Sequence, residues 1–445
     1  MTSTAAPNVL LIVSDDQRPD TIRALGNPAI ETPHLDRLVA RGTSFSRAYA
    51  GYPICHVSRA QILTGTHAFR ALPDYPAGAI DADLTTMGAT FSQAGWHTCY
   101  SGKWHNDGHP LERGYAVTSG LFSSGGAKGF TQPGVDERGR PLTGYRGWTF
   151  KDADNRPQLD RGIGLQPDNS REVVDGAIRA IESRPTDRPW FAHVNFAFPH
   201  DPRLWPAGME NYYDPAAIPL PPNFAASHPF EHGNLTGRDE RLLPAPRTGA
   251  AVREELALYY AMITDLDREV GRLLDALPAL GETIVIFTSD QGLALGSHGL
   301  IGKQNCYEHS IRSPLLIAGP GLPQGKQSGA LVNLQDLFPT LCDLAAITVP
   351  ATVTGRSLAP LLRGETEKVH DYVVGMFTDT QRMICDDRWK YVTYPQAGRE
   401  QLFDLVNDPH EQHDLGRSPE RAGVRNRLKE QLDRWRRENG DPLEP

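Results

Sequence analysis

Two pairs of polar residues in this sequence directly follow short apolar runs. Asp15 and Asp16 come after the run NVLLIVS, and Asp290 and Gln291 come after the run TIVIFTS. Apolar runs of this length are typical of strands that are buried on both faces. Since ligands of parallel α/β sheets gather at the carboxyl ends of the strands, we expect these oxygen-bearing side chains to line one edge of a sheet.

Other residues could carry out nucleophilic or acid–base chemistry, although each has an ordinary structural explanation when it is taken alone. Cys55 could be an inert thiol, because a free cysteine usually behaves as a small hydrophobic residue. His105 and His200 could be structural histidines in loops. Glu308 and Arg312 are four residues apart, which favours a structural ion pair on one helical face. Only the joint occurrence of such residues can decide between these readings.

The elements that must position these residues follow from the hydrophobic periodicity. Amphipathic segments alternate with apolar ones, which predicts a largely parallel, helix-flanked sheet. The expected strands are 8–14, 97–101, 190–196, 283–289 and 314–318, and the expected helices are 33–41, 86–95, 169–184, 252–277 and 335–344.

After about Gly364 the pattern changes to short β-type runs and a final charged helix. The runs at 372–377, 389–393 and 401–404, followed by a helix near 419–438, predict a small antiparallel sheet with a helix. We therefore expect two parts, a catalytic domain over residues 1–364 and a small α+β subdomain over residues 365–445.

Two long segments do not fit this alternation. Residues 120–166 and 202–247 are rich in Gly, Pro and Arg and exceed normal connection lengths, so we expect them to be insertions over the site. Arg238, Asp239 and His298 lie in such irregular stretches, where polar residues are expected at the surface rather than in a pocket.

The composition is that of an ordinary soluble protein, with 39% apolar and 22% charged residues. A net charge of −9 argues against nucleic-acid binding, which needs clustered Lys and Arg. No apolar run reaches membrane-spanning length and no leader-like segment precedes the first strand, so we expect a cytoplasmic protein, with a lost signal peptide as the alternative. The cysteines lack the spacing of a disulfide framework or a zinc site: Cys55, Cys99, Cys306, Cys342 and Cys385.

The segment from Cys55 to Gly65 (CHVSRAQILTG) resembles the sulfatase signature C-x-P/A-S-R, which is followed by a leucine and a T-G pair. Further segments match the family in the same order, from about residue 8 to residue 415. They are Asp15-Asp16, 32–38 (TPHLDRL), 102–105 (GKWH), 199–202 (PHDP), 289–292 (SDQG), 298–303 (HGLIGK) and 402–405 (LFDL). Together they identify the chain as similar to formylglycine-dependent sulfatases, and the resemblance implies an alkaline-phosphatase-like fold.

The resemblance implies that Cys55 is oxidised to formylglycine by a formylglycine-generating enzyme. One hydroxyl of the aldehyde hydrate attacks sulfur, and the second later expels sulfate. Hard oxygen ligands at Asp15, Asp16, Asp290 and Gln291, together with the oxygen at position 55, suit Ca²⁺, or Mg²⁺, rather than zinc.

The resemblance also assigns roles to the basic residues. Arg59 lies one helical turn after Cys55, so it can offset the charge of the hydrate. Lys103, His200 and Lys303 contact the sulfate oxygens, and the last two protonate the leaving alcohol. His105 takes the proton from the second hydroxyl. The substrate is a sulfated small molecule or saccharide that the sequence does not specify.

Two positions depart from the family pattern. Val57 stands where members usually carry Pro or Ala, so conversion of Cys55 has to be tested. Gln291 stands where Asn or His is frequent, but it keeps an amide oxygen as a ligand. Two alternatives stay open: a phosphodiester or phosphonate monoester hydrolase of the same superfamily, or a non-catalytic anion-binding protein in which Cys55 is unmodified.

Overall fold

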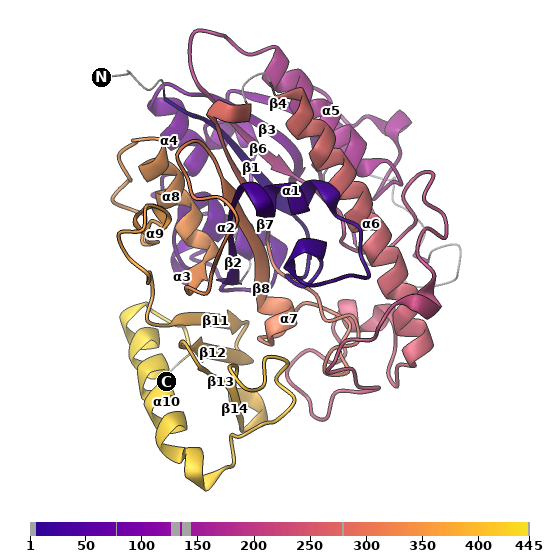
Figure 1. The fold of residues 1–445 in the computed structure, drawn as a ribbon, viewed down its shortest axis with the longest axis vertical. Helices are drawn as coiled ribbons and strands as arrows, with labels where there is room; N and C mark the ends of the chain where they lie inside the picture. The colour runs from indigo at the N-terminus through magenta and orange to yellow at the C-terminus, as the bar shows by residue number, and fades with distance from the viewer. Residues whose placement is uncertain (1–5, 77, 126–133, 136–143, 278–279, 444–445) are drawn as a thin grey trace.

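The computed structural model describes residues 6–76, 78–125, 134–135, 144–277 and 280–443. A ten-stranded sheet runs through the molecule, in the order β10-β2-β8-β7-β1-β6-β3-β4-β5, with β9 paired to β2 (Figure 1). Its strands are β1 (Asn8–Ser14), β2 (Gly42–Tyr49), β3 (His97–Trp104), β4 (Val117–Ser123), β5 (Thr149–Lys151), β6 (Trp190–Asn195), β7 (Thr283–Ser289), β8 (Arg312–Ala318), β9 (Lys326–Ser328) and β10 (Val332–Asn333).

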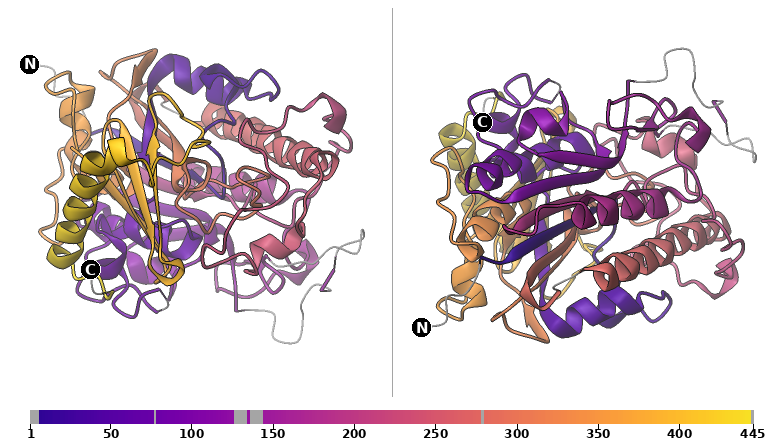
Figure 2. Two further views of the ribbon diagram at one scale, coloured as in Figure 1. Left: turned by 90° about the horizontal axis from the view of Figure 1, so that it is seen from below. Right: turned by 90° about the horizontal axis from the view of Figure 1, so that it is seen from above.

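Helices cover both faces of this sheet (Figure 2). They are α1 (Pro33–Arg41), α2 (Cys55–Thr64), α3 (Ala68–Ala71), α4 (Met87–Gln93), α5 (Asn169–Glu182), α6 (Gly249–Ala276), α7 (Glu308–Ile311), α8 (Leu337–Leu344) and α9 (Ala359–Leu362). Leu10 and Ile12 of β1 pack with α1, α5 and α6, whereas Val9, Leu11 and Val13 pack with α2, α4 and α8. The central strand is therefore buried on both faces, as its unbroken apolar sequence predicts.

The pairing confirms a largely parallel sheet. Strands β7, β1, β6, β3 and β4 are parallel neighbours, while β8 lies antiparallel to both β7 and β2, and β5 antiparallel to β4. Because β7, β1, β6 and β3 run in the same direction, their carboxyl ends meet at one edge of the sheet.

A second, four-stranded antiparallel sheet follows in the chain (Figure 1). It consists of β11 (Val373–Phe377), β12 (Gln381–Cys385), β13 (Trp389–Tyr394) and β14 (Arg399–Asp404), and α10 (Ala422–Glu438) packs against β12 and β13. Leu428 and Leu432 of α10 belong to the same apolar cluster as α2 and α8, so this small unit shares a core with the large sheet. The boundary at residue 364 stays a prediction.

The two long segments match only in part the prediction that they are insertions over the site. Residues 120–166 contain the end of β4 and all of β5, so part of that segment extends the sheet; residues 126–133 and 136–143 lie outside the described residues. Residues 202–247 contain two short 3₁₀ turns and Phe224, which forms an isolated β-bridge with Ser297. No helix in the described part of the chain is both long and apolar enough to cross a membrane.

Candidate active site

The acidic residues lie at the carboxyl ends of two neighbouring strands. Asp15 and Asp16 follow β1, Asp290 and Gln291 follow β7, and all four side chains are buried. The backbone N–H of Asp16 donates to Asp290 Oδ1 over 3.1 Å, which joins the two strand ends directly. The expected edge of oxygen-bearing side chains is therefore present.

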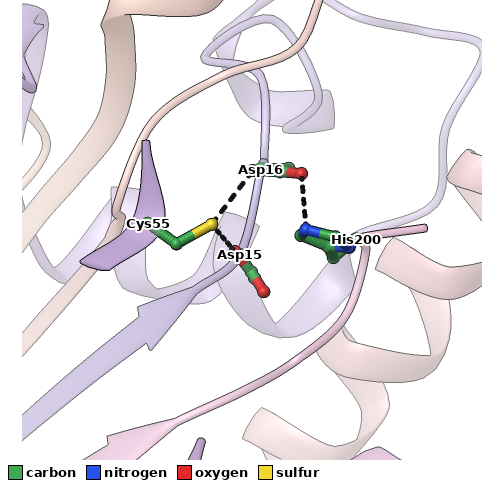
Figure 3. Close-up of side chains that lie close together, drawn as sticks. All are labelled: Asp15, Asp16, Cys55 and His200. Atoms are coloured by element: carbon green, nitrogen blue, oxygen red, sulfur yellow. Dashed lines mark hydrogen bonds and ion pairs between the residues drawn. The ribbon is translucent and has the colours of Figure 1, made fainter. Parts of the chain in front are cut away.

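The backbone at Asp16 explains how two consecutive carboxylates reach one point. Successive side chains of a strand point to opposite faces, but Asp16 has a φ of 65°, in the left-handed region, where Asp is tolerated better than most residues. This turn breaks the alternation. Asp15 Oδ1 lies 3.1 Å from the Sγ of Cys55 and Asp16 Oδ1 lies 3.9 Å from it (Figure 3).

Cys55 is the first residue of α2 and points into this group of acids (Figure 3). Its Sγ also lies 3.2 Å from Gln291 Nε2 and 3.3 Å from Lys303 Nζ. Burial and the neighbouring Asp15 carboxylate raise the pKa of the thiol well above its ordinary value. In the metal-free protein an unmodified Cys55 is therefore a thiol at neutral pH, and the thiol is a poor nucleophile.

Hydrogen bonds from Arg59 connect α2 to the ends of three strands. Its Nε donates to Asp290 Oδ2 over 2.9 Å, its Nη1 to Asn195 Oδ1 over 2.5 Å, and its Nη2 to the carbonyl of Ser14 over 3.3 Å. Asn195 is the last residue of β6 and was not singled out in the sequence. The guanidinium also lies 3.8 Å from Asp15, so it contributes positive charge beside the Cys55 position.

Two buried lysines pair with the two consecutive acids. Lys103 Nζ lies 2.6 Å from Asp15 Oδ2, and Lys303 Nζ lies 2.8 Å from Asp16 Oδ2. Gly102, before Lys103, has a φ of 89° at an irregularity in the β3–β4 pairing, and a Cβ there would lie 1.8 Å from the carbonyl oxygen of Asn195. Only glycine fits this bend of β3, which carries Lys103 to the edge of the sheet.

His200 joins the acidic group, whereas His105 lies beside it. His200 Nε2 lies 3.7 Å from Asp16 Oδ2 (Figure 3). Its Nδ1 lies 2.6 Å from the carbonyl of Asp201. Burial, with Lys303 nearby, lowers the pKa of His200 to about 3. The His105 ring contacts Trp148 with centroids 4.9 Å apart, and burial with the charge of Lys103 lowers the pKa of His105 well below its ordinary value. Both imidazoles are therefore neutral at pH 7 in the metal-free protein.

The structure adds residues that the sequence analysis missed or placed elsewhere. Tyr145, with a left-handed φ of 58°, donates its hydroxyl to Asp15 Oδ2 and packs its ring 4.6 Å from that of His200. Asp239 was expected at the surface but is buried, whereas Arg238 is partly exposed, with its guanidinium directed at the site. Arg238 Nη2 lies 3.4 Å from both His200 Nε2 and Asp201 Oδ1, and Asp239 is buried against Arg238.

His298 also differs from the surface position expected of it. Its ring stacks on Tyr307 with centroids 4.1 Å apart and is largely enclosed. By contrast, the expected ion pair of Glu308 with Arg312 is present at 3.4 Å, and Lys390 lies 3.0 Å from the same carboxylate. All five cysteines are free and buried.

The oxygen donors of the site fit a hard divalent cation, with the thiol of Cys55 and the imidazole of His200 beside them. One ligand atom from each of Asp15, Asp16, Cys55 and His200 lies within 4.8 Å of the others. Gln291 Oε1 is buried and has no hydrogen-bond partner among the described residues. Burial raises the pKa of Asp16 to about 7, and burial with Asp15 raises the pKa of Asp290, because neighbouring carboxylates repel one another in a dry site. A divalent cation relieves this repulsion and gives the amide oxygen a partner.

The fold is that of an alkaline-phosphatase-like hydrolase. It is a helix-flanked, largely parallel sheet, and Cys55 of α2 meets the acidic residues at the carboxyl edge of this sheet. The family model described as "Sulfatase" matches residues 7–347, and the model described as "N-sulphoglucosamine sulphohydrolase, C-terminal" matches residues 296–438. An arylsulfatase of Clostridium perfringens is 31% identical over 93% of this chain and 91% of its own length.

Solved structures show the same fold. One protein, in complex with its substrate D-glucosamine-2-N,6-O-disulfate, has a TM-score of 0.79 at 22% identity over 98% of both chains. The phosphonate monoester hydrolase of Agrobacterium radiobacter has a TM-score of 0.75 at 25% identity, over 97% of this chain and 96% of that one. The chain belongs to the sulfatase family and is thus a sulfuric ester hydrolase.

Proposed function

We propose that this chain hydrolyses the sulfate ester of a sulfated saccharide, using formylglycine made from Cys55 and one divalent cation. The observation that carries the proposal is the position of Cys55 Sγ, 3.1 Å from Asp15 and 3.3 Å from the ammonium of Lys303. A nucleophile at this point is surrounded by acids that can hold a metal and by cations that can hold an anionic ester.

The aldehyde hydrate supplies one hydroxyl for attack on sulfur and a second for release of sulfate, and a bound cation acidifies the attacking hydroxyl. The residues that would hold the cation are Asp15, Asp16, Asp290 and Gln291, together with residue 55. Ca²⁺ is the proposed ion, with Mg²⁺ as the alternative, because all these side chains offer hard oxygen.

The chain's own basic residues bind and orient the ester. Lys103 and Lys303, both buried, offer their ammonium groups to the sulfate oxygens. Arg59 holds α2 against the strand ends and adds positive charge beside residue 55. Lys303 delivers a proton to the leaving alcohol, together with His200 once the negative charge of the bound ester has favoured its protonation. His105, a neutral imidazole, accepts a proton when sulfate leaves.

The saccharide part of the proposal is supported by the match of residues 296–438 to the C-terminal model of N-sulphoglucosamine sulphohydrolase. It is also supported by the partly exposed guanidinium of Arg238 beside His200, where a leaving alcohol would lie. Guanidinium groups suit ligands that carry several acceptor oxygens.

A phosphonate monoester or phosphodiester is the second candidate, because the Agrobacterium radiobacter enzyme shares the fold. The net charge of the site limits the charge of the anion that can bind there. When a bound cation keeps all five carboxylates ionised, those of Asp15, Asp16, Asp201, Asp239 and Asp290 face the cations of Arg59, Lys103, Arg238 and Lys303, so the protein groups carry one net negative charge. A divalent cation turns this into one positive charge, which a monoanionic ester neutralises. A phosphate monoester, with a second pKa near 6, carries about two charges and fits less well.

The test is to produce the protein with and without a formylglycine-generating enzyme and to measure the mass of the peptide that contains residue 55. We expect turnover of sulfate esters to follow the fraction of aldehyde at this position. Cys55→Ser should not turn over, because a sulfated serine has no second hydroxyl for elimination, and Cys55→Ala should still bind metal. Full-rate hydrolysis by unmodified thiol protein would contradict the proposal. A panel of sulfate, phosphonate and phosphodiester substrates decides between the two candidates.

A further inference from the structure

A polar cavity of about 190 Å³ lies away from the active site, where the end of α2 meets the small C-terminal unit. Gln61 of α2, Asn333 at the end of β10, and Trp435 of α10 contribute to its wall. None of the residues assigned to the active site lines it. The volume corresponds to about six waters at about 30 Å³ each, which is the size of one small polar molecule.

One buried carboxylate holds the wall in place. Asp336 is fully buried and accepts hydrogen bonds from the backbone N–H of Asn333 and of Arg356, each over 2.8 Å. It also pairs with His370 Nε2 at 2.7 Å. Three chain segments that are distant in sequence are therefore fixed around the cavity before any ligand enters, which lowers the entropic cost of binding.

Two polar atoms in the wall lack partners. Gln61 Oε1 and His67 Nδ1 are buried and make no hydrogen bond to any described residue. Gln61 as a whole is only 3% exposed. A buried polar atom without a partner costs about 1–3 kcal/mol, so these atoms favour a polar occupant. When His370 donates from Nε2, its Nδ1 becomes another acceptor in the neutral imidazole.

The chemistry of the wall indicates the class of ligand. Side-chain amides of Gln61, Asn333 and Asn439 line the cavity, and Nδ2 of Asn439 already donates to the carbonyl of Trp435 over 2.8 Å. An amide offers both a donor and an acceptor, which matches the hydroxyl group. Trp435 adds an aromatic surface that can cover the apolar face of a ring. Arg356 and Asp371 are the charged residues of the wall apart from the histidines, and their charges oppose each other. A polyanion is therefore disfavoured.

We propose that this cavity binds a neutral, polyhydroxylated molecule of the size of a single sugar ring. Such a ligand satisfies Gln61 and His67 and bridges α2 to α10. Because α2 carries both Gln61 and Cys55, occupancy also stabilises the helix that presents the nucleophile position. Binding at this cavity does not depend on the proposed sulfatase activity.

The experiment measures melting temperature and heat of binding for the full chain with neutral monosaccharides. Glucose, galactose, N-acetylglucosamine and rhamnose are used up to about 50 mM, which covers millimolar affinities, with inorganic sulfate and glucose 6-sulfate as charged comparisons. We expect at least one neutral sugar to raise the melting temperature saturably, by about 1–3 °C at ten times its dissociation constant. The charged comparisons should give a smaller shift through this cavity.

Two variants locate the binding. Gln61→Ala removes the amide whose oxygen has no partner, and Thr354→Trp places a bulky side chain at an exposed position in the wall, at the loss of one hydrogen bond to Thr66. We expect each to weaken sugar binding at least tenfold, and Glu438→Ala, at an exposed position of α10 outside the cavity, to leave it unchanged. The proposal is overturned if no neutral sugar gives a saturable shift, or if binding survives undiminished in Thr354→Trp, since the sugar then binds elsewhere.

Discussion

Replacing Asp16 by asparagine should raise the stability of the metal-free protein at alkaline pH and reduce the stabilisation that a divalent cation gives. In the metal-free protein, burial raises the pKa of Asp16 to about 7 although Lys303 is close, whereas in the unfolded chain it is near 4. Folding therefore takes up a proton between these two values. The stability that Asp16 contributes is present below about pH 4 and is lost as the pH rises through about 7.

The pKa difference sets the size of the effect. About three pKa units correspond to about 4 kcal/mol as an upper bound. With an unfolding entropy of about 2.1 cal/mol/K per residue, this is about 4 °C for a chain of this length that unfolds as one unit. Asp16→Asn has no carboxylate to ionise, so above about pH 8 its metal-free form should melt up to about 4 °C higher than the parent. With Ca²⁺ at one hundred times the dissociation constant, the parent gains about 2.7 kcal/mol and the variant gains less.

The assay is scanning calorimetry of chelated and Ca²⁺-loaded protein from about pH 5 to about pH 8.5. Asp15→Asn is the matched control, because Lys103 and its neighbouring cations, opposing the effect of burial, hold the pKa of Asp15 well below its ordinary value. This control leaves Lys103 buried without its closest partner, so it should lose about 3–5 kcal/mol in both metal states. If metal-free Asp16→Asn melts below the parent at alkaline pH, the argument that the carboxylates await a cation is wrong.

Three further predictions concern residues around the site. Tyr145→Phe removes the hydrogen bond to Asp15, so kcat should fall about 5- to 30-fold with little loss of stability, measured by steady-state kinetics and thermal melting. Arg238→Gln should raise KM about tenfold with a smaller change in kcat, because it removes a charged donor on the leaving-group side; an unchanged KM would exclude Arg238 from substrate contact. Glu308→Gln should lower the free energy of unfolding by about 2–4 kcal/mol, because it weakens the buried pair with Lys390, and should leave kcat unchanged. Loss of turnover in fully folded Glu308→Gln protein would contradict that structural role.

The central strands and their polar ends could be predicted because an apolar run and a following pair of polar residues occur together in both. Strand β1 is apolar from Val9 to Val13 and is followed by Asp15, and strand β7 is apolar from Ile284 to Phe287 and is followed by Asp290. A strand that is buried on both faces has no position for a charged side chain along its length. Acidic residues that belong to the site can therefore appear only after the strand ends. Strand β2 was not predicted, because its sequence GTSFSRAY mixes small, polar and charged residues although most of it is buried.

The remaining site residues come from segments without periodicity. Tyr145 and Arg238 reach the acids from the two long irregular stretches, where neither spacing nor neighbouring residues indicate direction. Tyr145 depends on a left-handed backbone that tyrosine rarely adopts, so no local preference predicts its position. Asn195 ends a strand that was predicted, but nothing in its own sequence links it to Arg59, 136 residues earlier.

Arg59 shows why the Cys55 position is fixed before any metal binds. Its three nitrogens reach Asp290, Asn195 and the carbonyl of Ser14, so one side chain of α2 holds the ends of β7, β6 and β1. A planar guanidinium makes these bonds from three separate nitrogens, whereas an ammonium would have to reach all three acceptors from one nitrogen. Because Arg59 lies one helical turn after Cys55, the same bonds set the height and rotation of the helix at residue 55. The sequence predicts that Arg59 adds positive charge beside residue 55. In the structure Arg59 also aligns α2 with the acidic residues at the strand ends.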